Sequence, residues 1–267
     1  MLSTICDSRS VHLGASADEI IRLSDDIRGE LVGPLHSVDG ICPACRTWLP
    51  AITADGAEAN DCENCQEDRA ALGADPLNVA VISLYRKPSN LRDWLTRYKG
   101  RDEDDDPFDP VCVPIVRAIT GRFLLEHGDE FEHLAGGFDM ITVVPSTDRQ
   151  PPHPLESVIA SLDIDVPLVR LLERTDAHLG FREPNRHGYR TRTSSPSRVL
   201  LIDDVYTTGA RLNSAAAALT DGGHHVAASL VLARRVNTDY ATEAQAMWDT
   251  AASTPFDWTD SPWIPTS

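Results

Sequence analysis

The sequence predicts an α/β fold with a mostly parallel sheet and helices on both of its faces. Between residues 79 and 236, segments of strand composition alternate with segments of helical periodicity, which is typical of parallel sheets. The segment VLLI at 199–202 is apolar without interruption, as expected for a strand covered on both sides. Two Cys-x-x-Cys pairs precede this region and indicate a small metal-bound module ahead of the sheet.

Local composition and spacing define the elements. Ser16 and Glu19 form a capping box, and the apolar residues behind them predict an amphipathic helix over 16–33 that packs on the rest of the protein. The further elements in chain order are strand 79–84, helix 89–99, helix 110–127, strand 140–144, helix 154–162, strand 167–172, a polar loop 173–197, strand 198–203, helix 210–220 and strand 226–236. The chain thus divides into a helical segment (1–38), a ribbon (39–78), an α/β domain (79–236) and a Trp-bearing tail (237–267).

The 267 residues carry a formal net charge of −17, from 41 acidic against 24 basic side chains. This charge argues against non-specific nucleic-acid binding over the whole surface but allows a local basic site. Because the sequence has no apolar run of 18 residues and no signal-peptide pattern, we expect no membrane span and a cytoplasmic location. Thiols stay reduced in that compartment, so the six cysteines need an explanation other than disulfides.

Four cysteines have the spacing of a tetrahedral zinc site. Cys42 and Cys45 form one pair, Cys62 and Cys65 the second, and 16 residues separate the pairs. Four thiolates leave no open position, so we expect a structural Zn²⁺ whose binding supplies the folding energy of a very small module. Redox pairs and two disulfides are the alternatives. Cys112 stands in an apolar stretch and is expected in the core.

The most specific motif joins a buried strand to a helix through a loop rich in hydroxyls. Its residues are Asp203, Asp204, Val205, Tyr206, Thr207, Thr208, Gly209 and Ala210. Backbone N–H groups at the start of a helix bind anions, and the threonine hydroxyls add donors. The paired carboxylates suit ribose hydroxyls or a divalent cation, so the motif predicts a ribose 5-phosphate site. A capped helix without a ligand is one alternative, and an acidic pocket like that of response regulators is another.

This segment resembles the phosphoribosyl-diphosphate (PRPP) motif of type I phosphoribosyltransferases. The resemblance implies that Asp203 and Asp204 contact the ribose 2′- and 3′-hydroxyls and that residues 205–209 wrap the 5′-phosphate. Over residues 40–236 the chain is similar to the ComF-type branch, in which a zinc ribbon precedes a phosphoribosyltransferase domain. The expected fold is therefore type I phosphoribosyltransferase-like, and the expected cofactors are structural Zn²⁺ and, with PRPP, Mg²⁺.

The same resemblance assigns three further segments of the site. The first segment is Lys99, which the resemblance assigns to PRPP binding. The second binds PRPP and its diphosphate through Ser146, Thr147 and Arg149. The third is a flexible hood that contains Arg174, Arg182, Arg186 and Tyr189. Between residues 170 and 198 the hood region holds seven arginines against three acidic residues, and arginine is well suited to phosphate. A solvated charged loop is the alternative. The resemblance implies that Arg149 and Mg²⁺ stabilise the leaving diphosphate while the hood excludes water.

The chain departs from the branch at two places. Residues 150–154 read QPPHP and lack the arginine-glycine-phenylalanine-asparagine stretch that usually follows a proline-rich loop. Arg211 stands where a threonine is common. The diphosphate loop and the hood are therefore expected to handle a different second substrate or none, and the sequence does not identify the acceptor.

Two functions follow from the resemblance. The first is binding of PRPP or another ribose 5-phosphate, with transfer to an unknown acceptor and release of diphosphate. The second is a non-catalytic, nucleotide-responsive module in DNA uptake or regulation, because some ComF-type proteins act in DNA transformation. Residues 41–70 carry only Arg46 and Arg69 against six acidic residues, so the ribbon is expected to contact a protein partner or its own chain rather than DNA.

Overall fold

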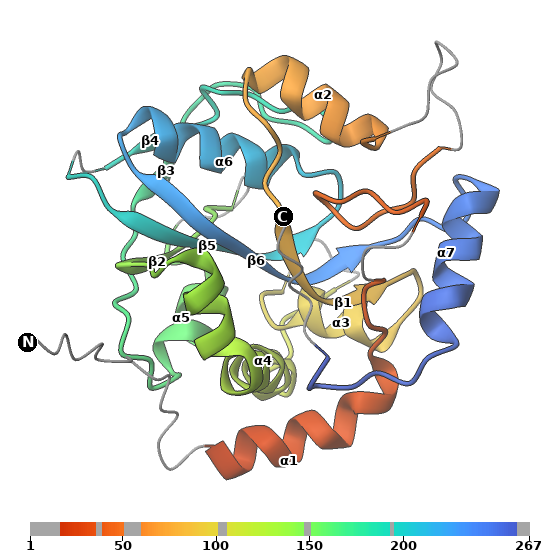
Figure 1. Cartoon of the computed structure of the whole chain (residues 1–267). Helices are drawn as coiled ribbons and strands as arrows, with labels where there is room; N and C mark the ends of the chain where they lie inside the picture. The colour runs from red at the N-terminus through yellow and green to blue at the C-terminus, as the bar shows by residue number, and fades with distance from the viewer. Residues whose placement is uncertain are drawn as a thin grey trace, which may run out of the picture.

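A parallel four-stranded sheet in the order β1-β6-β5-β2 forms the centre of the fold (Figure 1). The computed structural model describes residues 17–35, 39–50, 60–100, 106–146, 151–192 and 195–260. The strands are β1 (Val79–Tyr85), β2 (Met140–Val143), β5 (Arg198–Tyr206) and β6 (His225–Arg235). This arrangement confirms the predicted α/β class. Across these described ranges, no helix is both long and apolar enough to cross a membrane.

Period-two alternation along the strands divides the apolar residues into two cores, one on each face of the sheet. Leu200 and Ile202 of β5 belong to the first core, and Val199 and Leu201 belong to the second. The helices on the first face are α1 (Ala17–Ile27), α3 (Asn90–Arg97), α4 (Cys112–Ala135) and α5 (Pro154–Ala160). The second face carries α6 (Ala210–Asp221), with α2 (Glu63–Leu72) against it, and α7 (Thr242–Ala252) (Figure 1). Helices therefore cover both faces, as predicted.

Two of the predicted helices begin, as the structure shows, with a side chain that caps the first turn. Ser89 accepts a hydrogen bond from the backbone N–H of Arg92 at 3.3 Å and begins α3. His153 begins α5, where its Nδ1 accepts from the N–H of Leu155 and its own N–H donates to Glu156. The predicted cap at Ser16 lies outside the described residues.

Three sequence expectations need correction. The polar segment 173–197 is not one continuous loop, because β3 (Leu172–Arg174) and β4 (Tyr189–Thr191) pair in it as an antiparallel hairpin. Its strands of three residues are too short to show an alternating pattern. The strand expected over 167–172 is reduced to a parallel bridge between Leu168 and Ile141. The tail contains α7, which the sequence analysis did not predict and which buries Met247 and Trp248.

The N-terminal helix α1 packs on α4, as expected. Ile20 is 1 % exposed and lies over Gly121, where an added Cβ would stand only 2.8 Å from the Cδ1 atom of Ile20. The glycine therefore admits the isoleucine side chain. The next residue, Ile21, is 39 % exposed.

Replacing Ile20 should therefore destabilise the fold, whereas the same change at Ile21 should not. We expect Ile20→Ala to lower the free energy of unfolding by roughly 2 to 5 kcal/mol, since it leaves a cavity between α1 and α4. Ile21→Ala should change it by about 0.5 kcal/mol or less. Urea denaturation followed by circular dichroism measures both, and equal losses would contradict this packing.

Candidate functional site

The four cysteines predicted to bind zinc lie together at the second face of the sheet. The Sγ atoms of Cys42 and Cys65 are 3.8 Å apart, those of Cys45 and Cys62 are 3.4 Å apart, and all four lie within 4.8 Å of one another. Zn–S bonds of about 2.3 Å in a tetrahedron separate the sulfurs by about 3.8 Å. All four are free thiols, so the two-disulfide alternative does not hold. The cluster fits one structural zinc ion.

Short-range geometry brings each pair of cysteines to the cluster. The chain turns tightly at the first pair, where Cys42 O accepts a hydrogen bond from Arg46 N at 2.9 Å and Cys42 N donates to Thr47 O at 2.7 Å. Cys62 is the N-cap of α2, and Cys65 lies in its first turn. Hydrogen bonds among the four thiols lower the pKa of Cys42 and raise those of Cys45 and Cys65, as expected where neighbouring thiols share protons.

Two buried arginines face this cluster. Arg46 is 3 % exposed and Arg234, on β6, is 1 % exposed. Burial acts against the charge of Arg234, but the thiols, Cys45 first, raise its pKa above the ordinary value. A zinc ion with four thiolates has a net charge of −2, which two guanidinium groups balance. The sequence analysis missed Arg234, because an arginine near the end of an apolar strand gives no local signal of a distant counter-charge.

Metal binding should follow the four cysteines and no other thiol of the core. We expect one zinc ion per chain, and we expect Cys65→Ser to lose it and to unfold at a lower temperature. Cys112→Ser is the matched control, because Cys112 is also buried but belongs to the first core. Elemental analysis of the purified proteins measures the metal, and a Cys65→Ser protein that keeps its full zinc would contradict the assignment.

The two carboxylates of the predicted PRPP motif stand at the carboxyl end of β5, but they face different surroundings. Asp203 lines a crevice of about 240 Å³ between residues 205–212, which join β5 to α6, and residues 179–181 of the hood. Asp204 is 1 % exposed and points to the first face, where Tyr98 Oη donates to its Oδ2 at 2.7 Å and Lys99 Nζ lies 2.6 Å from the same oxygen. Adjacent strand residues point to opposite faces, which explains the separation.

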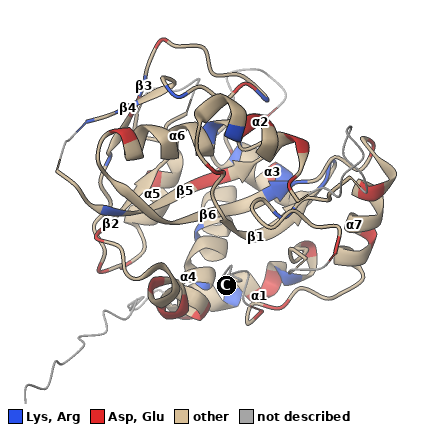
Figure 2. Cartoon of the chain, turned by 45° about the horizontal axis from the view of Figure 1, so that its top comes forward, with Lys and Arg blue, Asp and Glu red and all other residues tan. Residues whose placement is uncertain are grey.

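The surroundings give the two carboxylates opposite pKa shifts. Burial raises the pKa of Asp203 to about 6, although the charge of Arg211 acts to lower it. Burial alone would also raise the pKa of Asp204, but the Lys99 ammonium and hydrogen bonds from Lys99 and Tyr98 hold it below its ordinary value. Figure 2 shows the acidic end of β5 close to the basic segment after α3. At neutral pH, Asp204 is thus neutralised by its ion pair, and Asp203 is the carboxylate that faces the crevice.

The loop after β5 is held in place from the ribbon side. Gly209 has a φ of +99°, and an added Cβ there would stand 2.2 Å from Tyr206 Oη and 2.7 Å from Asp68 Oδ2. Only glycine fits this position. Asp68, on α2, accepts a hydrogen bond from Asn213 Nδ2, and Asn213 Oδ1 accepts from Leu77 N at 3.1 Å. The helix of the ribbon therefore supports the start of α6.

Val205 and Tyr206, which the sequence analysis placed in the phosphate loop, belong to the strand β5. Tyr206 is 2 % exposed, and its ring lies 4.8 Å from the guanidinium carbon of Arg234. The loop proper runs from Thr207 to Gly209, and α6 begins at Ala210. Thr208 is buried, and its Oγ1 accepts from the N–H of Ala210 at 3.5 Å. These residues line the same crevice as Asp203.

The hood residues are engaged with the protein itself. Arg174 donates to the carbonyls of Gly188 and Ala177, Arg182 to Asn64 Oδ1, and Arg186 to Asp221 and Leu72 O. Tyr189 is buried, and its Oη donates to Pro145 O at 3.2 Å. The hairpin is therefore tied to the ribbon, to α6 and to the end of β2.

The predicted diphosphate loop is only partly within the described residues. Ser146 follows β2, whereas Thr147 and Arg149 lie outside the described ranges. His153, which the sequence analysis did not assign to the site, is buried at the start of α5. Burial, followed by the charge of Lys99, lowers its pKa although Asp204 acts to raise it.

No protein-family model and no curated protein matches the chain.

Asp68 gives the junction between ribbon and loop a pH dependence. Burial raises its pKa to about 7, well above that of an aspartate in the unfolded chain. The folded protein then holds a proton that the unfolded chain loses near pH 4, so stability from this group is lost as the pH rises from about 4 to about 7.

The variant Asp68→Asn should remove this dependence while keeping an oxygen that accepts from Asn213. Relative to the parent protein, we expect it to gain up to roughly 4 kcal/mol in free energy of unfolding as the pH rises from 4 to 7. Above pH 7 the difference should stay constant. Urea denaturation at a series of pH values measures this, and a difference that falls with pH would contradict the burial of Asp68 as a protonated acid.

Proposed function

We propose that this protein binds PRPP or another ribose 5-phosphate as a ComF-type phosphoribosyltransferase-family protein. The observation that carries the proposal is the crevice in which Asp203, the loop 207–209 and the start of α6 meet at the carboxyl edge of a parallel sheet. Ligands of open α/β sheets bind at this edge. A ribose 5-phosphate carries hydroxyls at one end and a phosphate at the other. The crevice offers a carboxylate for the hydroxyls and, beside it, a loop for the phosphate.

Each part of the crevice supports one part of this ligand. Asp203 would accept hydrogen bonds from the ribose hydroxyls, for which its ionised form is needed. Thr207, Thr208 and the first N–H groups of α6 would donate to the 5′-phosphate. Arg211, which departs from the usual threonine of the branch, lines the crevice and adds a positive charge.

Asp204 and Lys99 would act as a pair in this proposal. The carboxylate fixes the Lys99 ammonium 2.6 Å away, next to the end of β5, while Tyr98 holds the carboxylate from α3. An ammonium in this place would attract the diphosphate of PRPP. Asp204 would thus orient the lysine, whereas Asp203 would contact the sugar.

A Mg²⁺ ion fits this site as a companion of the ligand. Mg²⁺ is usually held by one or two carboxylates together with substrate phosphates, and Asp203 is the carboxylate that lines the crevice. When bound, the ion would offset the charge of the diphosphate.

In a transfer reaction, the bond between the ribose C1 and the diphosphate oxygen would break as a bond from C1 to the acceptor forms. Diphosphate would leave, and the acceptor would lose a proton. Binding without transfer, as a nucleotide-responsive module, is the second candidate. The observation that favours it is that the hood arginines donate to the protein's own carboxylates and carbonyls.

Calorimetric titration with PRPP and Mg²⁺ tests the binding proposal. We expect saturable binding at millimolar ligand or below, and at least a tenfold weaker affinity in Asp203→Asn, which keeps the shape of the side chain but loses the charge that accepts from the hydroxyls. Asp129→Asn is the matched control, because Asp129 is exposed on α4, remote from the crevice residues in the sequence. Absence of binding, or equal affinity in Asp203→Asn, would overturn the proposal.

Turnover distinguishes an enzyme from a binding module. Release of diphosphate from PRPP in the presence of bases, amines or ammonia would establish transfer. Binding without release across that panel would favour the module.

A further inference from the structure

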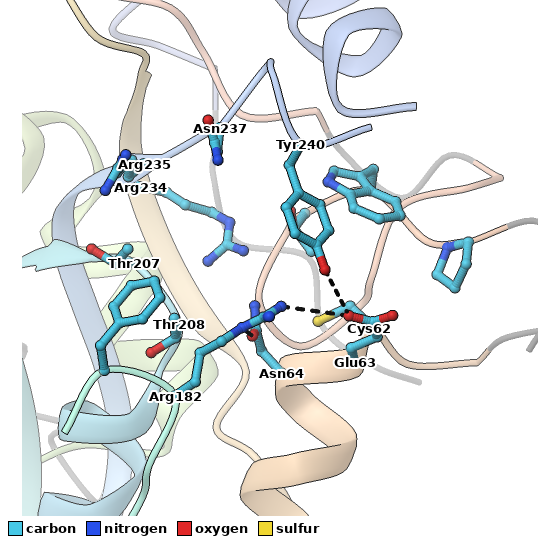
Figure 3. Close-up of a pocket in the computed structure, with 14 residues that line it drawn as sticks. Cys62, Glu63, Asn64, Arg182, Thr207, Thr208, Arg234, Arg235, Asn237 and Tyr240 are labelled. Carbon is cyan, nitrogen blue, oxygen red and sulfur yellow. Dashed lines mark hydrogen bonds and ion pairs between the residues drawn. The ribbon is translucent and has the colours of Figure 1, made fainter. Parts of the chain in front are cut away.

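A second cavity lies on the ribbon side of the phosphate loop. It has a volume of about 170 Å³, and its walls come from the ribbon, the tip of the hood, the loop and the end of β6. Figure 3 shows Thr207 and Thr208 on one side of it and Tyr240 with Cys62 on the other. Neither function considered above uses this cavity.

The two cavities share part of their walls. Thr207, Thr208 and Phe181 line both the crevice with Asp203 and the second cavity. The phosphate loop therefore separates two spaces instead of closing one. A phosphate on Thr207 and Thr208 would have the sugar in the crevice on one side and the second cavity on the other. A group attached to that phosphate would therefore fit into the second cavity.

The far wall of the second cavity offers aromatic surface. Tyr240 is 53 % exposed, and its ring lies 6.0 Å from the ring of Trp48. The guanidinium carbon of Arg182 lies 5.5 Å from the Tyr240 ring, and Arg182 is fixed there by Asn64 at 2.9 Å. Such a wall suits a planar ring, which stacks on aromatic and guanidinium groups.

The space between loop and wall carries positive charge. Glu63, the acidic residue of the cavity lining, is paired with Arg182 and accepts from Tyr240 Oη. Arg234 also lines the cavity, but its charge faces the cysteine cluster. Arg235 is the remaining cation of the lining. A cation between a phosphate loop and an aromatic wall suits a second phosphate group.

We propose that the second cavity binds the group carried by a substituted 5′-phosphate, so that the ligand is a ribose 5-phosphate extended through a diphosphate to a planar ring. The ribose would contact Asp203, the first phosphate the loop, the second phosphate Arg235, and the ring Tyr240. This inference rests on the proposed function, because it takes the loop as the phosphate site.

Two probes separate the inference from the proposed function. ADP-ribose has the extended form, and ribose 5-phosphate has only the part that the crevice would hold. In calorimetric titrations with Mg²⁺, we expect ADP-ribose to bind at least tenfold more tightly than ribose 5-phosphate. Tyr240→Ala and Arg235→Gln should each remove most of that gain and leave the affinity for ribose 5-phosphate within about twofold.

Matched variants control for ring and charge. Tyr240→Phe keeps the ring and should keep most of the gain, and Arg22→Gln removes an arginine from the exposed side of α1 and should change neither affinity. Equal affinities for the two probes, or a tighter binding of ADP-ribose that persists in Tyr240→Ala, would overturn the proposed role of the second cavity. The proposed ribose 5-phosphate site would be unaffected by either result. If ADP-ribose binding needs Tyr240 but is unchanged in Asp203→Asn, one ligand does not span both cavities, and the inference is overturned. If neither probe binds, both proposals are overturned.

Discussion

The attraction between a buried guanidinium and a cluster of buried thiols holds the ribbon and the sheet in one arrangement. Arg234 belongs to β6, whereas the cysteines that surround its charge belong to the ribbon. Removing one partner of a buried pair leaves an uncompensated charge, which typically costs about 3 to 5 kcal/mol. Both partners are therefore needed at this contact, and a ribbon too small for its own core is fixed against β6.

The same pair influences the shape of the loop from Thr207 to Gly209. Arg234 stands opposite Tyr206 in the register of β5 and β6, and its guanidinium lies over the tyrosine ring. The hydroxyl of that tyrosine, together with Asp68 of the ribbon helix, fills the space above Gly209. The backbone of the loop thus follows from contacts with the ribbon. Zinc in the ribbon would stabilise the site in the α/β domain although no cysteine lines the crevice with Asp203.

Local signals allowed much of this structure to be predicted from the sequence. The apolar run of β5, the helix expected over 89–99 and the cysteine spacing each depend on residues close together in the chain, and each agrees with the structure. The structural roles of Arg234 and Asp68 could not be predicted, because each depends on contact partners more than 100 residues away in the sequence. The β3–β4 hairpin escaped prediction because strands of three residues are too short to show an alternating pattern.

Two adjacent acidic residues in a sequence motif need not face the same surroundings. The pleat of β5 sends Asp203 to the crevice and Asp204 to the opposite face, where Lys99 and Tyr98 satisfy it. The crevice is therefore lined by one of the two carboxylates, beside Arg211. A chain with a net charge of −17 can in this way contain a crevice with one acidic and one basic side chain, because most of its acidic residues lie elsewhere.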